Sequence, residues 1–350
     1  MTLDDLWNGT GEWLKGTGPD PDIVMSSRIR LARNLAKYPF PHWASEEQLE
    51  GAISDFESAY KQAQGYFNGA LFLRMKELDS IEKQMLIERH LISREHIFNP
   101  EHKAVLISER EIISIMVNEE DHLRIQVLQP DFNLRDTWEL ADRIDEELEQ
   151  YLDFAVFSDL GYLTCCPTNV GTGLRASCMV HLPALVMTKQ VGKIVQAIGK
   201  LGMTARGLFG EGTEAYGNFF QISNQVTLGH SEEEIVDNLE RIIKQIIEQE
   251  TAARNSIFAN QRLLLEDRIS RSLAELKSAK LISSEETLGL LSIIRLGADL
   301  GIVKGLDRSM LNNLFIQIQP AHLQKKEGKQ LSAEERDAVR AEFISKKFNI

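Results

Sequence analysis

The chain has few cysteines and no long apolar run. Its three cysteines, Cys165, Cys166 and Cys178, crowd into one short stretch. An odd number in one segment is a poor disulfide framework, and no second Cys/His cluster stands at zinc-site spacing. No apolar run reaches the roughly 18 residues that a membrane span needs. The polar stretch 1–20 lacks the pattern of a secretory signal. We therefore expect a cytoplasmic protein without a metal cage.

Positive charge is also scarce. Lys and Arg number 39 against 52 Asp and Glu, which gives a net charge of −13. A nucleic-acid-binding protein usually shows a basic face, so this class is disfavoured. Acid is concentrated in 139–153 and 231–250, with seven carboxylates in each. These stretches predict either solvated helix faces or a surface that attracts basic protein substrates.

The periodicity of apolar residues changes along the chain. Short β-branched runs predict strands at 23–31, 104–107, 112–117, 123–128, 219–222 and 226–228. Helical spacing predicts helices at 46–64, 134–152 and 184–200, the first beginning with a capping box at Ser45 and Gln48. Beyond Ser231 the strand signals fade and helical spacing continues, with further capping boxes at Ser231 and Ser332. We predict an α+β domain over 1–230 and an all-helical domain over 231–350.

Several arginines stand beside small residues or glycine, namely Arg28, Arg30, Arg124, Arg175 and Arg206. The planar, permanently charged fork of arginine suits phosphate oxygens. Converging guanidinium groups can neutralise a triphosphate and the charge that develops in phosphoryl transfer. A lone arginine is more often a surface residue, so the interpretation depends on all five acting together. The stretch 171–175 lacks the P-loop pattern.

Carboxylates and one cysteine complete a possible guanidinium site. Glu119, Glu120 and Asp121 are consecutive, which predicts either a solvated turn or a catalytic base. A guanidinium is a poor nucleophile, and a carboxylate must align it and accept its proton. Glu211 lies among glycines and is a second candidate, on a loop that can move. Cys166 is either a packing residue or a thiolate that polarises the guanidinium.

These segments resemble the phosphagen kinases, the family of creatine and arginine kinases. Asn118–Arg124 and Cys166–Ala176 are similar to its two signature segments, and Ser26–Arg30 and Arg206–Glu211 match two more in the same order. The resemblance implies a mostly antiparallel central sheet flanked by helices. It also implies Glu120 as the base, Cys166 as the thiolate and Glu211 as a second substrate carboxylate. ATP would contact Ser26, Ser27, Arg28, Arg30, His90, Arg124, Arg175, Ala176, Ser177, Arg206 and Gly207. Magnesium would be held mainly by the nucleotide.

The order of the domains resembles the bacterial protein-arginine kinases in particular. In members that act on small guanidines, a helical domain precedes the first motif, whereas here the motif begins at Ser26 and helices follow 231. The resemblance covers the whole chain. It implies phosphorylation of arginine in proteins, which marks them for Clp protease degradation and relieves a heat-shock repressor. The implied partners are that repressor, an activator protein, the ClpC unfoldase and a second copy in a homodimer.

One motif of the tail belongs to the same resemblance. Arg336, Asp337, Arg340 and Ala341 follow the Ser332 cap and match a phosphoarginine receptor motif. Arg336 and Arg340 are four residues apart and share a helix face. A plain solvated helix is the alternative. For the whole chain, the alternatives are a kinase of free arginine or another small guanidine, and a catalytically silent phosphoarginine-binding adaptor.

Overall fold

The computed structural model describes residues 2–207 and 216–348, and the chain forms two compact units. Unit 1 comprises Met1–Trp13, Ser26–Cys178 and Ser223–Arg241. Unit 2 comprises Leu14–Met25, Met179–Ile222 and Ile242–Ile350. The division of the chain at residue 230 stays a prediction.

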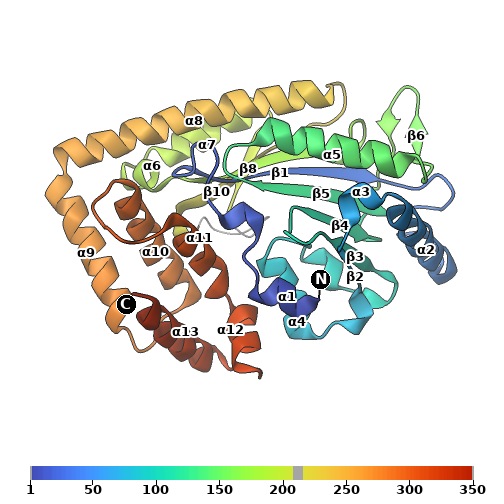
Figure 1. Ribbon diagram of the computed structural model, residues 1–350. Helices are drawn as coiled ribbons and strands as arrows, with labels where there is room; N and C mark the ends of the chain where they lie inside the picture. Colours follow the sequence, from blue (N-terminus) through green and yellow to red (C-terminus); the bar gives the residue numbers. More distant parts are fainter. Residues whose placement is uncertain (1, 208–215, 349–350) are drawn as a thin grey trace. The chain divides into compact units, whose positions relative to one another are not determined.

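Figure 1 labels most of the helices and strands. The strands are β1 (Val24–Arg33), β2 (Leu71–Arg74), β3 (Ala104–Ile107), β4 (Ile113–Val117), β5 (Leu123–Pro130), β6 (Val156–Phe157), β7 (Gly161–Tyr162), β8 (Leu174–His181), β9 (Met203–Arg206) and β10 (Phe219–Asn224). The helices are α1 (Leu3–Asn8), α2 (Glu46–Gln62), α3 (Gln64–Phe67), α4 (Ser80–Glu88), α5 (Leu134–Glu149), α6 (Pro183–Met187), α7 (Val191–Lys200), α8 (Glu232–Asn260), α9 (Arg262–Ser278), α10 (Ser284–Asp299), α11 (Arg308–Gln317), α12 (Pro320–Glu327) and α13 (Ala333–Phe348).

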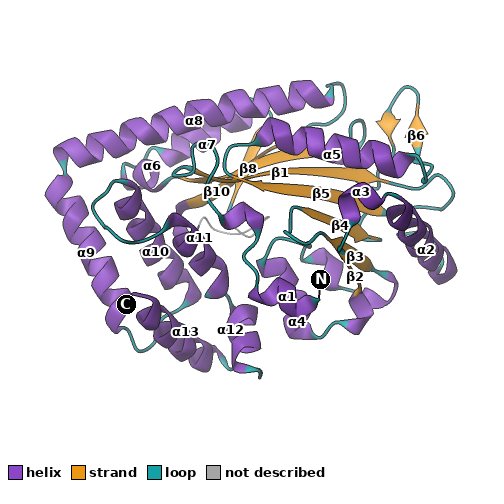
Figure 2. Cartoon of the chain, viewed as in Figure 1, coloured by secondary structure: helices purple, strands orange, loops and turns teal. Residues whose placement is uncertain are grey.

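Eight of the strands form a sheet of order β2-β3-β4-β5-β1-β8-β10-β9, and β6 and β7 pair in a small second sheet. Figure 2 draws the strands in orange. The pairs β2–β3, β3–β4, β4–β5 and β1–β5 are all antiparallel. Every residue of β3 and β4 is buried, which explains their continuous apolar runs. Helix α5 packs on β5 and buries Leu134, Trp138 and Ile144 against it.

The elements agree with most of the sequence predictions. The predicted strand at 104–107 is β3, and the capping boxes at Ser45, Ser231 and Ser332 are all formed. The strand predicted at 226–228 is wrong. That stretch is a loop, because the Thr227 hydroxyl bonds to the carbonyls of Thr168 and Val170.

The helix predicted at 184–200 is two helices, α6 and α7. Lys189 lies between them with φ +58°, a left-handed conformation that a continuous helix does not allow. The predicted fold class is confirmed, since a mostly antiparallel sheet flanked by helices precedes the helical C-terminal region. No helix in the described part of the chain is both long and apolar enough to cross a membrane.

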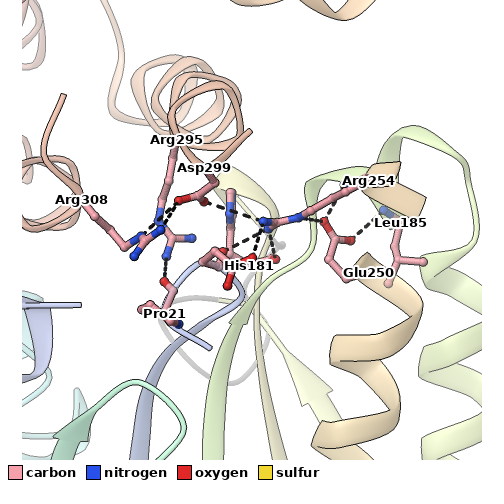
Figure 3. Close-up of polar contacts among 10 residues, drawn as sticks. Pro21, His181, Leu185, Glu250, Arg254, Arg295, Asp299 and Arg308 are labelled. Atoms are coloured by element: carbon pink, nitrogen blue, oxygen red, sulfur yellow. Dashed lines mark hydrogen bonds and ion pairs between the residues drawn. The ribbon is translucent and has the colours of Figure 1, made fainter. Parts of the chain in front are cut away.

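Within unit 2, α10 contacts α6, α9 and α11, and α13 packs on α9 and α12. Figure 3 shows a cluster of buried charges beside α10. Arg254 forms ion pairs with Glu250 at 2.8 Å, Asp22 at 3.2 Å and Asp299 at 3.8 Å. Asp299 also pairs with Arg308 at 2.8 Å. Each buried charge thus has an opposite charge close by, as burial requires.

The same cluster fixes two chain segments in unit 2. The Glu250 carboxylate accepts the backbone N–H groups of Ala184 and Leu185 at the start of α6. Arg295 donates from Nη2 to the carbonyl of Pro21 at 2.8 Å, and burial lowers its pKa to about 10. Glu250 and Arg295 are buried, so their charged groups need these backbone partners in place of water. The cluster therefore attaches the start of α6 and the segment 14–25 to the helices that carry these charges.

Candidate active site

Three arginines share one face of unit 1's sheet. In the β1–β5 register, Arg30 lies opposite Gln126 and Ala32 lies opposite Arg124. Side chains alternate along a strand, so Arg28, Arg30 and Arg124 point to the same side. This confirms the shared face of Arg28 and Arg30 that alternation predicts.

Arg30 is at the centre of the positive charge. Burial lowers the pKa of the Arg30 guanidinium well below its ordinary value, and the charges of Arg28, Arg124 and Arg175 lower it further. Its Nε atom is buried and has no hydrogen-bond partner among the described residues. Four guanidinium groups that repel one another at a partly buried position are costly unless an anion binds there. The structure therefore brings together four of the five predicted ATP-binding arginines.

His90 lies beside this cluster, and its backbone is in the left-handed region with φ +59°. Burial, with a smaller contribution from the charge of Arg28, lowers the pKa of His90 to about 3. Its ring meets Trp13 edge-on at 5.4 Å, and its carbonyl accepts from Gln126. The imidazole is therefore neutral and contacts Trp13, while Gln126 holds the His90 backbone.

The three consecutive carboxylates have different surroundings. Glu119 has a 3% exposed side chain that pairs with Arg124 at 2.9 Å and accepts from Ser93 at 2.7 Å. Asp121, 3% exposed, accepts from Asn34 at 2.6 Å and from the Cys165 N–H at 2.7 Å. The Glu120 side chain is 36% exposed. Of the three carboxylates, Glu120 is therefore the one that an acceptor substrate can reach.

Electrostatics around Glu120 suit a proton acceptor. Burial raises the pKa of its carboxyl group, and the charges of Asp121 and Glu119 raise it further, against the lowering effects of Arg124 and His42. A carboxylate with a raised pKa holds an abstracted proton better than an ordinary one. Glu120 Oε2 lies 3.6 Å from Nη2 of Arg124.

Cys166 lies just before a short 3₁₀ turn, Pro167–Asn169. Its Sγ atom is 3.0 Å from the Thr168 hydroxyl, and its carbonyl accepts from the Thr164 hydroxyl at 2.8 Å. Cys165 and Cys166 are both half-buried. Burial and the nearby Asp121 carboxylate raise the pKa of the Cys165 thiol to about 12, which keeps that thiol protonated at neutral pH.

The smaller predicted ATP contacts lie on β1 and β8. Ser26 and Ser27 are buried, and the Ser27 hydroxyl donates to the carbonyl of Asp131. The Ser177 hydroxyl accepts from Nε of Arg28 at 3.4 Å, and the Ala176 N–H donates to Asn224. The buried Ser177 hydroxyl thus helps to position the Arg28 guanidinium.

The remaining predicted site residues belong to other parts of the chain. Arg206 ends β9 and, like Gly207, belongs to unit 2. Glu211 lies outside the described residues. Among residues 2–207 and 216–348, no group of three or more His, Cys, Asp or Glu side chains is arranged to hold a metal ion.

The predicted phosphoarginine motif lies in α13 of unit 2. The Arg340 side chain is 1% exposed, and it donates to the carbonyls of Ile318 and Ile282 and to Asp337 at 2.5 Å. Arg336 is partly exposed and donates to the Leu331 carbonyl. Ala341 is buried. Arg340 thus supports Asp337 from inside, and Arg336 and Asp337 are the members that reach the surface.

Two family models cover most of the chain. Residues 52–253 match the ATP:guanido phosphotransferase C-terminal catalytic domain, and residues 262–350 match the protein-arginine kinase McsB C-terminal domain. A protein-arginine kinase of Desulforamulus reducens is 48% identical over 98% of this chain and 96% of its own length. One from Halothermothrix orenii is 49% identical over the whole of both chains. The chain belongs to the protein-arginine kinase family. It is an enzyme of the phosphotransferase class.

Solved structures agree on the fold. A lombricine kinase aligns with a TM-score of 0.60 at 25% identity, over 73% of this chain and 72% of its own. The duplicated taurocyamine kinase of Schistosoma mansoni aligns with a TM-score of 0.61 at 24% identity. That alignment covers 67% of this chain and 34% of the longer kinase. The phosphagen-kinase resemblance drawn from four motifs is confirmed.

Sequence reasoning missed two residues that contact predicted site residues. Asn34 bonds to Asp121 of the carboxylate triplet, and Thr168 contacts the Cys166 sulfur. Thr168 stands two residues after the cysteine, and its hydroxyl could have been noticed there. Asn34 gave no signal, because it lies 87 residues from Asp121 along the chain.

Proposed function

We propose that this enzyme transfers the γ-phosphoryl group of ATP to the guanidinium of arginine residues in proteins. The observation that carries the proposal is the position of Glu120. It is the reachable carboxylate of its triplet, its pKa is raised, and it lies 3.6 Å from an arginine of the four-guanidinium cluster. A phosphate-binding surface thus adjoins a base suited to a guanidinium.

The roles of the residues follow from their surroundings. Arg28, Arg30, Arg124 and Arg175 would bind the ATP phosphates, and binding would relieve the repulsion at Arg30. Magnesium would be held mainly by the nucleotide phosphates. Glu120 would accept the guanidinium proton as the N–P bond forms, while the ADP oxygen leaves. The Cys166 thiolate would hold the guanidinium without being phosphorylated itself.

The acceptor is a protein in this proposal because the relatives of matching length are named for that activity. Unit 1 also carries an acidic surface that suits basic substrates. On α5 and the start of α8, Glu146 and Glu233 are exposed and Asp142 and Glu232 are partly exposed. Partial burial raises the pKa of Asp142, and the charges of these neighbouring glutamates raise it further. Carboxylates crowded so closely attract an arginine-bearing segment.

The further proposals concern what happens to the product. By family resemblance, phosphorylated proteins would pass to the ClpC unfoldase and its protease, and phosphorylation of a heat-shock repressor would relieve repression. An activator protein and a second copy of this chain would be the other partners. Arg336 and Asp337, both partly exposed, would bind phosphoarginine and make the product an effector.

A single mixture tests the central proposal against its alternatives. The enzyme is incubated with MgATP, free arginine and an arginine-rich protein, and phosphoarginine is measured by mass spectrometry under non-acidic conditions. We expect phosphoarginine in the protein, formed about 10² to 10⁴ times more slowly with Glu120→Gln. Product confined to free arginine would indicate a small-guanidine kinase. If neither acceptor is phosphorylated but the protein binds added phosphoarginine, it is a catalytically silent adaptor.

A further inference from the structure

Two segments that carry predicted catalytic groups lie far apart in sequence. One is the turn 119–122 with Glu120, and the other is the stretch 163–168 with Cys166. If both groups act on one guanidinium, their separation must be held within a fraction of an ångström, since a 1 Å displacement can cost about 100-fold in rate. Within unit 1, one buried side chain bonds to both segments.

That side chain is Asn34, which follows β1 and is 1% exposed. Its Oδ1 accepts the N–H of His122 at 2.9 Å. Its Nδ2 donates to Asp121 Oδ1 at 2.6 Å and to the Leu163 carbonyl at 3.1 Å. The amide orientation is therefore determined by its partners, because two acceptors face the nitrogen and one donor faces the oxygen.

Asp121 extends the connection to the cysteine segment. The same Oδ1 that accepts from Asn34 also accepts the backbone N–H of Cys165 at 2.7 Å. Asp121 directly follows Glu120, and Cys165 directly precedes Cys166. One buried amide and one buried carboxylate thus cross-link the backbone beside each predicted catalytic group. Hydrogen bonds to a buried carboxylate are stronger than neutral ones, so the link is stiff.

The chain just before and after Asn34 reinforces the arrangement. The Asn34 carbonyl accepts the N–H of Ala155 at 2.7 Å, and the Leu35 N–H donates to Nδ1 of His122 at 3.2 Å. Nδ1 of His122 is thereby the acceptor nitrogen of a neutral ring, and burial lowers the pKa of His122 to about 4. The turn is therefore held through both the main chain and the side chain of His122.

We propose that Asn34 is a positioning residue, whose amide sets the distance between Glu120 and Cys166 through Asp121 and the Cys165 backbone. The inference rests on the proposed function, since it assumes that both groups act on one acceptor guanidinium. Neither Asn34 nor Asp121 touches the reacting atoms in this scheme. Their effect should appear in the rate of reaction and not in nucleotide binding.

Removal of the link is the sharpest test. Asn34→Asp keeps the side-chain shape but turns a carboxylate oxygen toward Asp121 Oδ1 and the Leu163 carbonyl, so that acceptors face acceptors. Asp121→Ala removes the acceptor that Asn34 and the Cys165 N–H share. We expect each to lower kcat by about 10- to 100-fold with KM for ATP unchanged. Because both variants break the same link, the double variant should lose little more than the worse of the two single variants. Single variants with wild-type kcat, or losses that multiply in the double variant, would overturn the proposal.

Hydrogen exchange provides a readout that needs no activity. Deuterium uptake is compared in peptides covering 119–124 and 161–170. We expect both to lose protection together in Asn34→Asp, and neither in Asn312→Asp. Asn312 is an equally buried asparagine of unit 2 that donates to the Leu14 carbonyl, and it controls for general loss of stability. Loosening of one peptide alone would show that the segments are held separately.

The two proposals can fail independently. If the wild-type enzyme makes no phosphoarginine, the proposed function fails, while the exchange data still decide whether Asn34 links the segments. If Asn34→Asp does not fold, Asn34→Ser replaces it, because it removes the bond to Leu163 without adding a charge. Wild-type exchange and kcat in Asn34→Ser would then overturn the proposal.

Discussion

Glu120 lies 3.6 Å from Nη2 of Arg124, and the same nitrogen pairs with Glu119 at 2.9 Å. Arg124 thus forms the closer ion pair with the buried Glu119, and Glu120 stays accessible to a substrate. This arrangement separates two adjacent carboxylates into a structural partner and a candidate base. The predictions below start from this separation.

Replacement of Glu120 tests the base. Glu120→Gln keeps the shape but cannot accept the guanidinium proton, so kcat should fall by about 10² to 10⁴. Binding of ATP, followed with a fluorescent nucleotide, should change little. Glu109→Gln is the control, since Glu109 is exposed in the turn between β3 and β4. Near-normal phosphorylation by Glu120→Gln would show that another group is the base.

The pH dependence of kcat/KM reports the same carboxylate. Burial and the neighbouring acids raise the pKa of Glu120 above its ordinary 4.5. As the pH falls through this raised pKa, Glu120 takes up a proton and activity is lost, so the acid limb should lie above 4.5. His42→Asn removes a positive charge that lowers this pKa, and it should move the limb further up. A limb at or below 4.5 contradicts the prediction.

The Thr168 hydroxyl, 3.0 Å from the Cys166 sulfur, can donate a hydrogen bond to a thiolate. Thr168→Val keeps the shape and removes the donor, so iodoacetamide should alkylate Cys166 about 10-fold more slowly, with a similar loss in kcat. Thr168→Ser keeps the hydroxyl and serves as the control. Acceptor protein with MgATP should slow alkylation in the wild type. Equal alkylation of the valine variant and the wild type would assign the contact to packing.

Mutation of the two arginines of the tail motif should have different effects, one on stability and the other on phosphoarginine binding. Arg340 is enclosed and bonds to two carbonyls, so Arg340→Ala should destabilise unit 2 by about 3 kcal/mol or more. Arg336→Ala should leave the melting temperature nearly unchanged and weaken phosphoarginine binding. Calorimetric titration measures this, with the catalytic pocket blocked by a nucleotide analogue. Undiminished affinity in an Arg336→Ala, Asp337→Ala double variant returns the segment to a solvated helix.

Acid should destabilise the fold through its buried histidines. Burial lowers the pKa of His96 to about 4, whereas the unfolded value is about 6.5. The unfolded state therefore binds the proton first, and stability is lost as the pH falls from 6.5 toward 4. The free energy of unfolding in urea should fall by about 1.4 kcal/mol per pH unit from this residue. His96→Gln keeps the bond from Nε2 to Ala104 and should reduce the slope by that amount.

Much of the local structure could be predicted from the sequence. Capping boxes at Ser45, Ser231 and Ser332 involve residues three apart, so their hydrogen bonds need no tertiary contact. Strand alternation likewise places Arg28 and Arg30 on one face. The strand predicted at 226–228 was wrong because apolar residues there resemble a strand. Hydrogen bonds from Thr227 to the distant Thr168 and Val170 determine the path of this loop.

The amino-acid order by itself determined which residue types are available for phosphoryl transfer to a guanidinium, and four motifs were enough to identify the family. Only the tertiary structure decided which of them are free to act. Glu120 differs from Glu119 and Asp121 because Arg124, Ser93 and Asn34 neutralise or bind the other two. Asn34 reaches its partners across 87 and more residues, and burial makes those bonds strong. The exposure of a side chain and its hydrogen-bond partners depend on which distant segments pack against it, so no local sequence pattern encodes them.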